Sequence, residues 1–173
     1  MRNARARSLL SCGLLSCGWL TLAAACSAAP RTLTRDNFAS LEKIDIHVHI
    51  NSPDSALIDQ AAADHFRLLT INVDYPDFPP IAEQARIARE LAAAHPAMLA
   101  YAATFSMRGW DEPGWQRHVI QELDAAFAAG AVAVKVWKNI GMEFRDANGR
   151  LVMIDDPKFD HVLLPVGRVP AAH

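Results

Sequence analysis

The feature that most constrains this sequence is a regular alternation of strand-like and helical segments that begins at residue 43. Runs rich in branched apolar residues recur at residues 43–50, 67–73, 98–105 and 131–137. Between these runs, apolar residues repeat at helical spacing, and glycine or proline separates the units. Alternation without an antiparallel pattern predicts a parallel sheet whose strands are joined by right-handed helical crossovers.

Capping signals mark the ends of the expected helices. Ser52 and Pro53 are expected as the N-cap and first residue of the first helix. The second helix is expected to end near His95, before a proline, and Gly130 fits the C-terminal cap of the third. Further along, the turn sequence at residues 146–149 predicts a small β-excursion above the sheet.

A parallel sheet of this kind is either an open doubly wound sheet or part of an eight-stranded barrel. No glycine-rich phosphate loop follows any expected strand, which argues against dinucleotide binding. The first and fourth strands alternate polar with apolar residues, whereas a strand between two helix layers is apolar on both faces. The sequence therefore predicts an α/β fold built from the parallel (β/α) units of a TIM-barrel-type fold.

The first expected strand contains Asp45, His47 and His49 at alternate positions. Strand periodicity places these three side chains on the inner face and the intervening isoleucines and valine against helices. Two imidazoles so spaced start ~6–7 Å apart at their backbones and can converge on one ion. Asp45 could bind that ion directly or orient a histidine ligand. Alternatively, the three residues are polar side chains at an exposed strand edge.

The first 28 residues are typical of a secretory signal. Arg2, Arg5 and Arg7 precede an uncharged apolar run, and small residues follow it. Cleavage after Ala28 competes with lipoprotein-type processing, in which Cys26 becomes the lipidated first residue. Both predict an exported protein, either periplasmic or lipid-anchored in the bacterial envelope, and the only expected membrane contact is a lipid at Cys26.

Composition restricts the chemistry of the exported chain. All cysteines of the chain lie in the leader: Cys12, Cys17 and Cys26. No disulfide or thiolate metal site is therefore expected, so histidine, carboxylate or a modified lysine must hold any metal. Without the leader's three arginines the net charge is about −5, and this acidic balance argues against nucleic-acid binding.

Three segments together resemble the amidohydrolase superfamily of metal-dependent (β/α)8-barrel enzymes, most closely its amidohydrolase-related branch. They are residues 44–49 (Ile-Asp-Ile-His-Val-His), 70–80 and 134–142. The resemblance extends from Lys43 to about Asp160. It implies that His47 and His49 bind a divalent metal at the carboxyl end of the first strand, with zinc expected and manganese as the alternative. It also implies a small-molecule substrate.

The fourth strand adds Lys135, which alternation with valines directs inward. A buried lysine is costly unless it is paired, neutralised or modified. In the family, a lysine on this strand either forms a carbamate that bridges metals or stays unmodified as a substrate contact or salt-bridge partner. Carbamate, substrate contact and a structural role all remain open for Lys135, and Lys138 and Asn139 are weaker candidates.

Several other residues are weaker candidates for the functional site. Four of them end the second and third strands and would surround the mouth of a barrel, although loop capping is favoured for each: Asn72, Asp74, Thr104 and Ser106. Trp110 and Trp115 either line a substrate loop or pack it. The remaining histidines are not expected as ligands: His65, His95, His118, His161 and His173.

The resemblance also exposes a break in the pattern. The family completes its site with histidines after strands 5 and 6 and an Asp general base after strand 8, and a full barrel takes ~250 residues. This sequence has only four such strands, and prolines and a glycine follow Asp160. We expect a signal peptide at residues 1–28 and a linker at residues 29–42. Residues 43–160 are expected to form the N-terminal half of a barrel, truncated after about four strands. Residues 161–173 are expected to be an irregular, frameshifted tail.

The expected function is metal-dependent hydrolysis of an ester, lactone or amide bond through a metal-activated water, impaired by the missing half. A metal-dependent decarboxylase of the same superfamily and a non-catalytic exported fragment are the alternatives. An open half-barrel would also expose sheet edges, so self-association is expected.

Overall fold

The computed structural model describes residues 32–163. The signal at residues 1–28, the lipidation at Cys26 and the tail from residue 164 onward lie outside these residues. The chain divides into two compact units, residues 1–33 and 34–173, and the second contains the sheet and its helices. Within residues 32–163, no helix is long and apolar enough to span a membrane.

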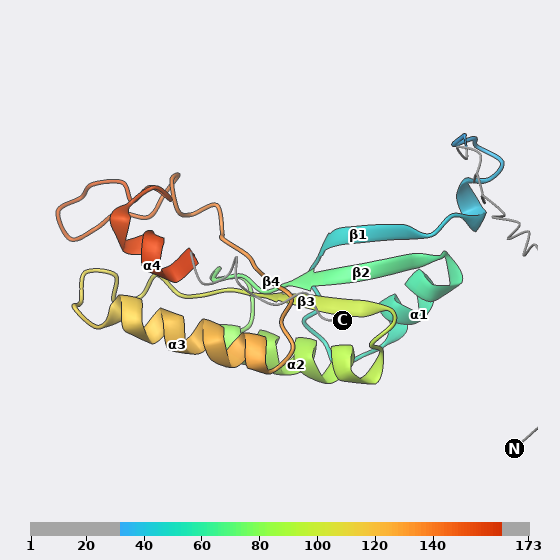
Figure 1. Ribbon diagram of the computed structural model, residues 1–173, viewed down its shortest axis with the longest axis horizontal. Helices are drawn as coiled ribbons and strands as arrows, with labels where there is room; N and C mark the ends of the chain where they lie inside the picture. Colours follow the sequence, from blue (N-terminus) through green and yellow to red (C-terminus); the bar gives the residue numbers. More distant parts are fainter. Residues whose placement is uncertain (1–31, 164–173) are drawn as a thin grey trace, which may run out of the picture. The chain divides into compact units, whose positions relative to one another are not determined.

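Four parallel strands form one curled sheet in the order β1-β2-β3-β4 (Figure 1). They are β1 (Lys43–Val48), β2 (Phe66–Ile71), β3 (Leu99–Ala103) and β4 (Ala133–Val134). The crossover helices are α1 (Ala56–Ala63), α2 (Ile81–Ala94) and α3 (Trp115–Ala128). Figure 1 shows all three on the same side of the sheet, as in a barrel wall and unlike a doubly wound sheet. The predicted fold class is confirmed.

Two apolar clusters hold the helices to the sheet. One joins α1 and α2 to β2 and β3 through Ile58, Leu68 and Leu99. The other surrounds α3 and packs buried aromatic residues against β3 and the segment after β4: Tyr101, Phe105, Trp110, Trp115 and Phe159. Trp110 and Trp115 therefore belong to the core, with ring centroids 4.6 Å apart, and do not line a substrate loop.

Several element boundaries differ from the sequence-based expectation. The first helix begins at Ala56, because the Asp54 side chain accepts a hydrogen bond from the Ala56 N–H (2.7 Å), so Ser52 and Pro53 precede it. β4 is only two residues long. Gly130 has a φ of +100°, as expected of a residue that ends α3.

The expected linker and the start of the expected irregular tail contain short helices. The expected linker includes a 3-10 helix, η1 (Phe38–Ser40). A second 3-10 helix, η2 (Pro157–Phe159), leads into α4 (Asp160–Leu163), so the first residues of the expected tail are helical. Val162 of α4 is buried in the cluster around α3, and this packing explains a helix that sequence propensity did not predict.

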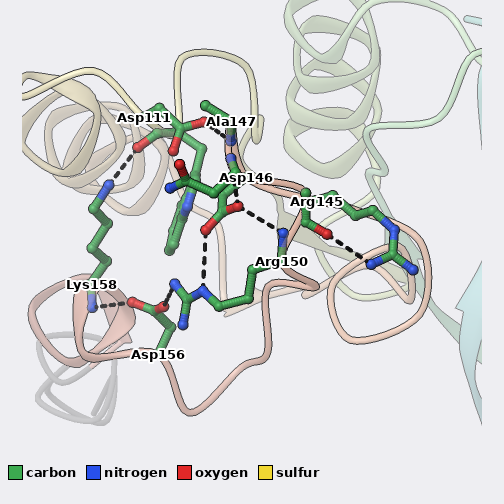
Figure 2. Close-up of polar contacts among 10 residues, drawn as sticks. Asp111, Arg145, Asp146, Ala147, Arg150, Asp156 and Lys158 are labelled. Atoms are coloured by element: carbon green, nitrogen blue, oxygen red, sulfur yellow. Dashed lines mark hydrogen bonds and ion pairs between the residues drawn. The ribbon is translucent and has the colours of Figure 1, made fainter.

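The expected β-excursion is present at the predicted turn. Arg145 and Leu151 form an antiparallel bridge, and the Asp146 carboxylate accepts hydrogen bonds from backbone N–H groups within the turn. Figure 2 shows how Arg150 joins Asp146 to Asp156, at 3.1 and 3.0 Å. These contacts fold residues 145–156 into a compact loop.

Candidate functional site

A one-residue bulge in β1 separates Asp45 from the two histidines. Asp45 pairs with Leu68 but Val48 pairs with Thr70, so β1 has one residue more than β2 over this stretch. Paired residues of a parallel ladder share a face, and a one-residue slip moves side chains to the other face. Asp45 therefore lies on the helix-covered face with Leu68, whereas His47 and His49 lie on the opposite, open face. The predicted common face of these three residues is wrong.

The bulge also changes the environment of the apolar residues of β1. Ile44 and Ile46 are 65% and 67% exposed, so the expectation that they pack against helices is wrong. Ile44 pairs with the exposed Arg67, on the face that no helix covers. Beyond the bulge the expectation is confirmed, because Val48 and Ile50 pack in the cluster of α1 and α2.

Asp45 nevertheless acts on the histidine segment through the backbone. Its carboxylate accepts a hydrogen bond from the His47 N–H at 3.0 Å. This contact spans the bulge and holds the backbone from which the His47 ring projects. A direct metal bond from Asp45 is not supported by this geometry, while an orienting role is compatible with it.

The two histidine rings lie edge to face with their centroids 5.4 Å apart. Nδ1 of His49 is 3.0 Å from the carbonyl oxygen of Ile71 at the end of β2. A carbonyl only accepts, so Nδ1 carries the hydrogen, and Nε2 of the neutral ring keeps its lone pair. Burial lowers the pKa of His49, although the Ile71 hydrogen bond raises it, and the nearby His47 and Lys135 lower it further. His49 is therefore a neutral imidazole whose Nε2 lone pair is available to bind a metal ion.

The loop after β2 connects the ends of β1 and β4 through aromatic contacts. The Phe78 ring lies 4.8 Å from that of His49, and the Tyr75 ring lies 5.6 Å from that of Trp137. Lys135 places its Nζ 5.9 Å from the Trp137 ring centroid. The structure thus brings the histidine pair and Lys135 to one site on the open face, at the carboxyl ends of the strands.

The inward placement of Lys135 is confirmed by its neighbours. Val134 and Val136 pack against the cluster around α3, so Lys135 points to the opposite face and is half-buried there. Its backbone N–H donates to Ala103 and its carbonyl accepts from the Thr104 hydroxyl. The end of β3 therefore fixes the backbone that carries this lysine.

Sequence reasoning missed the residue that holds the aromatic loop. Gln84 of α2 is fully buried; its Oε1 accepts from the Val73 N–H (3.0 Å), and its Nε2 donates to the carbonyls of Val73 (2.9 Å) and Pro79. The available signal was a polar residue three positions after Ile81 on the apolar face of a helix. Tyr75 and Phe78 were likewise treated only as loop residues.

Two of the four polar residues expected at the ends of β2 and β3, Asp74 and Ser106, cap the loop after β3. The Ser106 hydroxyl donates to Asp74 at 2.7 Å, and the Met107 N–H donates to the same carboxylate oxygen at 3.3 Å. Asn139 caps its own turn through the Ile140 N–H. Lys138 is exposed and contacts only the Trp137 ring among the described residues. None of these contacts involves His47 or His49.

A cleft of about 760 Å³ adjoins the loop. Its lining includes Tyr75 and Phe78, which contact the site, and the polar residues Arg108, Asn139 and Glu143. This volume is in the range of small-molecule sites.

The two histidines fit a metal in ligand type, and the Ile71 hydrogen bond orients the ring of His49. Among residues 32–163, no group of three or more His, Cys, Asp or Glu side chains surrounds one point. His65 and His118 are exposed, and His95 is half-buried. No family model, curated protein or solved structure matches this chain.

Proposed function

We propose that this protein is a metal-dependent hydrolase of the amidohydrolase type, which cleaves an ester, lactone or amide bond of a small molecule. The observation that supports it most is the hydrogen bond from His49 Nδ1 to the Ile71 carbonyl, because metal-binding histidines characteristically donate their second ring nitrogen in this way. The resemblance of residues 44–49 to the metal-binding strand of that superfamily is the second support.

In this proposal His47 and His49 hold a divalent ion, with zinc expected and manganese as the alternative. Bound there, the ion would polarise the substrate carbonyl and lower the pKa of the attacking water. The Ile71 carbonyl keeps the His49 ring in its donor orientation, and Asp45 holds the backbone of His47.

Lys135 is the third functional residue of the proposal. It lies on the same face as the histidine pair, and its charge is close enough to lower the pKa of His49. As an ammonium group it would contact a substrate oxygen, and as a carbamate it would supply a further carboxylate ligand. Intact-mass measurement with and without bicarbonate distinguishes these two forms of Lys135.

Export through the leader at residues 1–28, with or without a lipid at Cys26, belongs to the same proposal. Mass spectrometry of the N-terminus of the protein recovered from a bacterial envelope fraction tests it. An intact leader in that sample would contradict export by cleavage.

The metal is tested by titrating purified protein with zinc and measuring the bound metal after dialysis. We expect a zinc site that is lost in the double variant His47→Ala/His49→Ala. The matched control is His118→Ala/His161→Ala, which removes two exposed histidines elsewhere on the molecule and should keep that site. Equal zinc binding by both double variants would contradict the proposed ligands.

Hydrolysis is tested separately with a chromogenic carboxylic ester, before and after chelation of the metal. Turnover that disappears on chelation and returns with zinc supports the hydrolase. Zinc binding without any metal-dependent turnover would retain the metal site and refute the hydrolytic activity.

A further inference from the structure

The helix-covered face of the sheet contains a second cavity, of about 560 Å³, between α2 and α3. Small side chains form its walls on both helices: Ala82, Ala85, Ala125, Ala126 and Ala129. The floor comes from the ends of β2 and β3, including Asn72 and Tyr101. The histidine pair and Lys135 do not line this cavity, although Asp74 and Arg108 line both it and the cleft beside the aromatic loop.

Asn72 directly follows β2 and lines this cavity. Strand alternation places Asn72 on the same face of the sheet as Leu68 and Thr70. Thr70 pairs with Tyr101, and the Tyr101 hydroxyl donates to carbonyls at the end of α3, so this is the helix-covered face. Asn72 is only 3% exposed, and its amide nitrogen Nδ2 has no hydrogen-bond partner among the described residues. A buried donor without a partner is costly, so this nitrogen is set up for an acceptor that the protein itself does not provide.

The polar groups near Asn72 are already engaged. The Thr104 hydroxyl donates to the Lys135 carbonyl, and the Ser106 hydroxyl donates to Asp74. Gln84 uses its side-chain amide on the backbone of Val73 and Pro79. None of these hydrogen bonds involves Asn72.

Two of the charged side chains that line the cavity are arginines without an ion-pair partner among the described residues. Its two acids already have partners, because Asp74 accepts from Ser106 and Glu122 pairs with His118 at 3.2 Å. Arg89 and Arg108 also line the cavity, and neither forms an ion pair within residues 32–163. The two acids and two arginines therefore balance in charge, but both arginines are available to an anion, and alanine walls lie between them.

We propose that this cavity binds an aliphatic monocarboxylate. A carboxylate oxygen accepts the hydrogen bond from Asn72 Nδ2, and the two arginines balance the negative charge. The hydrocarbon chain packs along the alanines of α2 and α3, which leave room for it. This ligand site goes beyond the proposed hydrolase and does not depend on it.

The test titrates the purified full chain with octanoate by calorimetry and follows the Asn72 side-chain amide by NMR. We expect saturable binding with a shift of that amide signal. Asn72→Leu should weaken binding about tenfold or more, because it removes the donor while keeping the side-chain volume. Removing a buried unpaired amide should not lower the urea midpoint, so loss of binding is separable from unfolding.

A steric variant gives a second, independent measurement. Ala85→Leu fills the cavity from α2 and should abolish binding, whereas Ala93→Leu changes an exposed position on the same helix and should leave it unchanged. Octanol, with the same chain and no carboxylate, should bind at least tenfold more weakly than octanoate. Absence of saturable octanoate binding, equal binding by Asn72→Leu, or equal binding of octanol would each overturn the proposal.

Discussion

Gln84→Leu tests how the helical layer holds the site loop. Gln84 is fully buried, and its side-chain amide makes two hydrogen bonds to Val73, of 3.0 and 2.9 Å, and one to Pro79. Leucine has a similar volume, so the substitution removes these hydrogen bonds without opening a large cavity. The change therefore isolates the polar connection between α2 and the loop that contacts His49.

The expected cost follows from what the substitution leaves behind. Val73 is itself fully buried, so both its N–H and its carbonyl lose their partner in a place that water does not reach. Each such unmade group costs about 1–3 kcal/mol, so the two groups give a loss of about 2–6 kcal/mol in the free energy of unfolding. The half-buried Pro79 carbonyl can turn to solvent and should add little.

Urea denaturation followed by circular dichroism measures this loss. With a slope of about 2 kcal/mol per M, the midpoint should fall by about 1–3 M. Gln121→Leu is the matched control, because Gln121 is exposed on α3 and its substitution should change stability by less than about 0.5 kcal/mol. If both variants unfold at the wild-type urea concentration, the buried Gln84 hydrogen bonds do not stabilise the fold.

Two further predictions concern pH and self-association. Hydrogen bonds from the Arg150 and Asn148 N–H groups and the Arg150 guanidinium lower the folded-state pKa of Asp146, so its stabilisation is present above about pH 4 and lost as the pH falls through that lowered value. As the pH falls below about 4, the urea midpoint should decrease less steeply for Asp146→Asn than for the wild type. Equal pH dependence of the midpoint in the two proteins would contradict a stabilising role of the Asp146 carboxylate. We also propose that the open face of β1 associates with a second copy, so sedimentation velocity should detect dimers that Ile44→Thr/Ile46→Thr weakens by about 2–4 kcal/mol. A monomer at every concentration would refute this association.

Much of the fold followed from local patterns. Branched strand runs and helical spacing predicted three crossovers and four parallel strands, and the structure contains them. Gly130 was recognisable as the end of α3, because few other residues adopt its positive φ. The valines around Lys135 also indicated the correct face, since β4 continues the register of β3 without a bulge.

The candidate site was predictable only in part. His47, His49 and Lys135 were named from the sequence, and the structure places them on one open face. The face of Asp45 could not be predicted, because strand periodicity assumes an unbroken ladder and one extra residue in β1 reverses it. Gln84 was missed because its role depends on Val73 and Pro79, which meet it only after α2 packs on the sheet.

The sequence by itself therefore determined the kinds of element, their order and the donor atoms, since these depend on local propensity and side-chain chemistry. The tertiary structure alone decided which donors share a face, which loop reaches His49, and where Asn72 is buried without a partner among the described residues. The physical reason is that register, bulges and buried hydrogen bonds depend on residues far apart in the chain, and no local pattern encodes which of them meet.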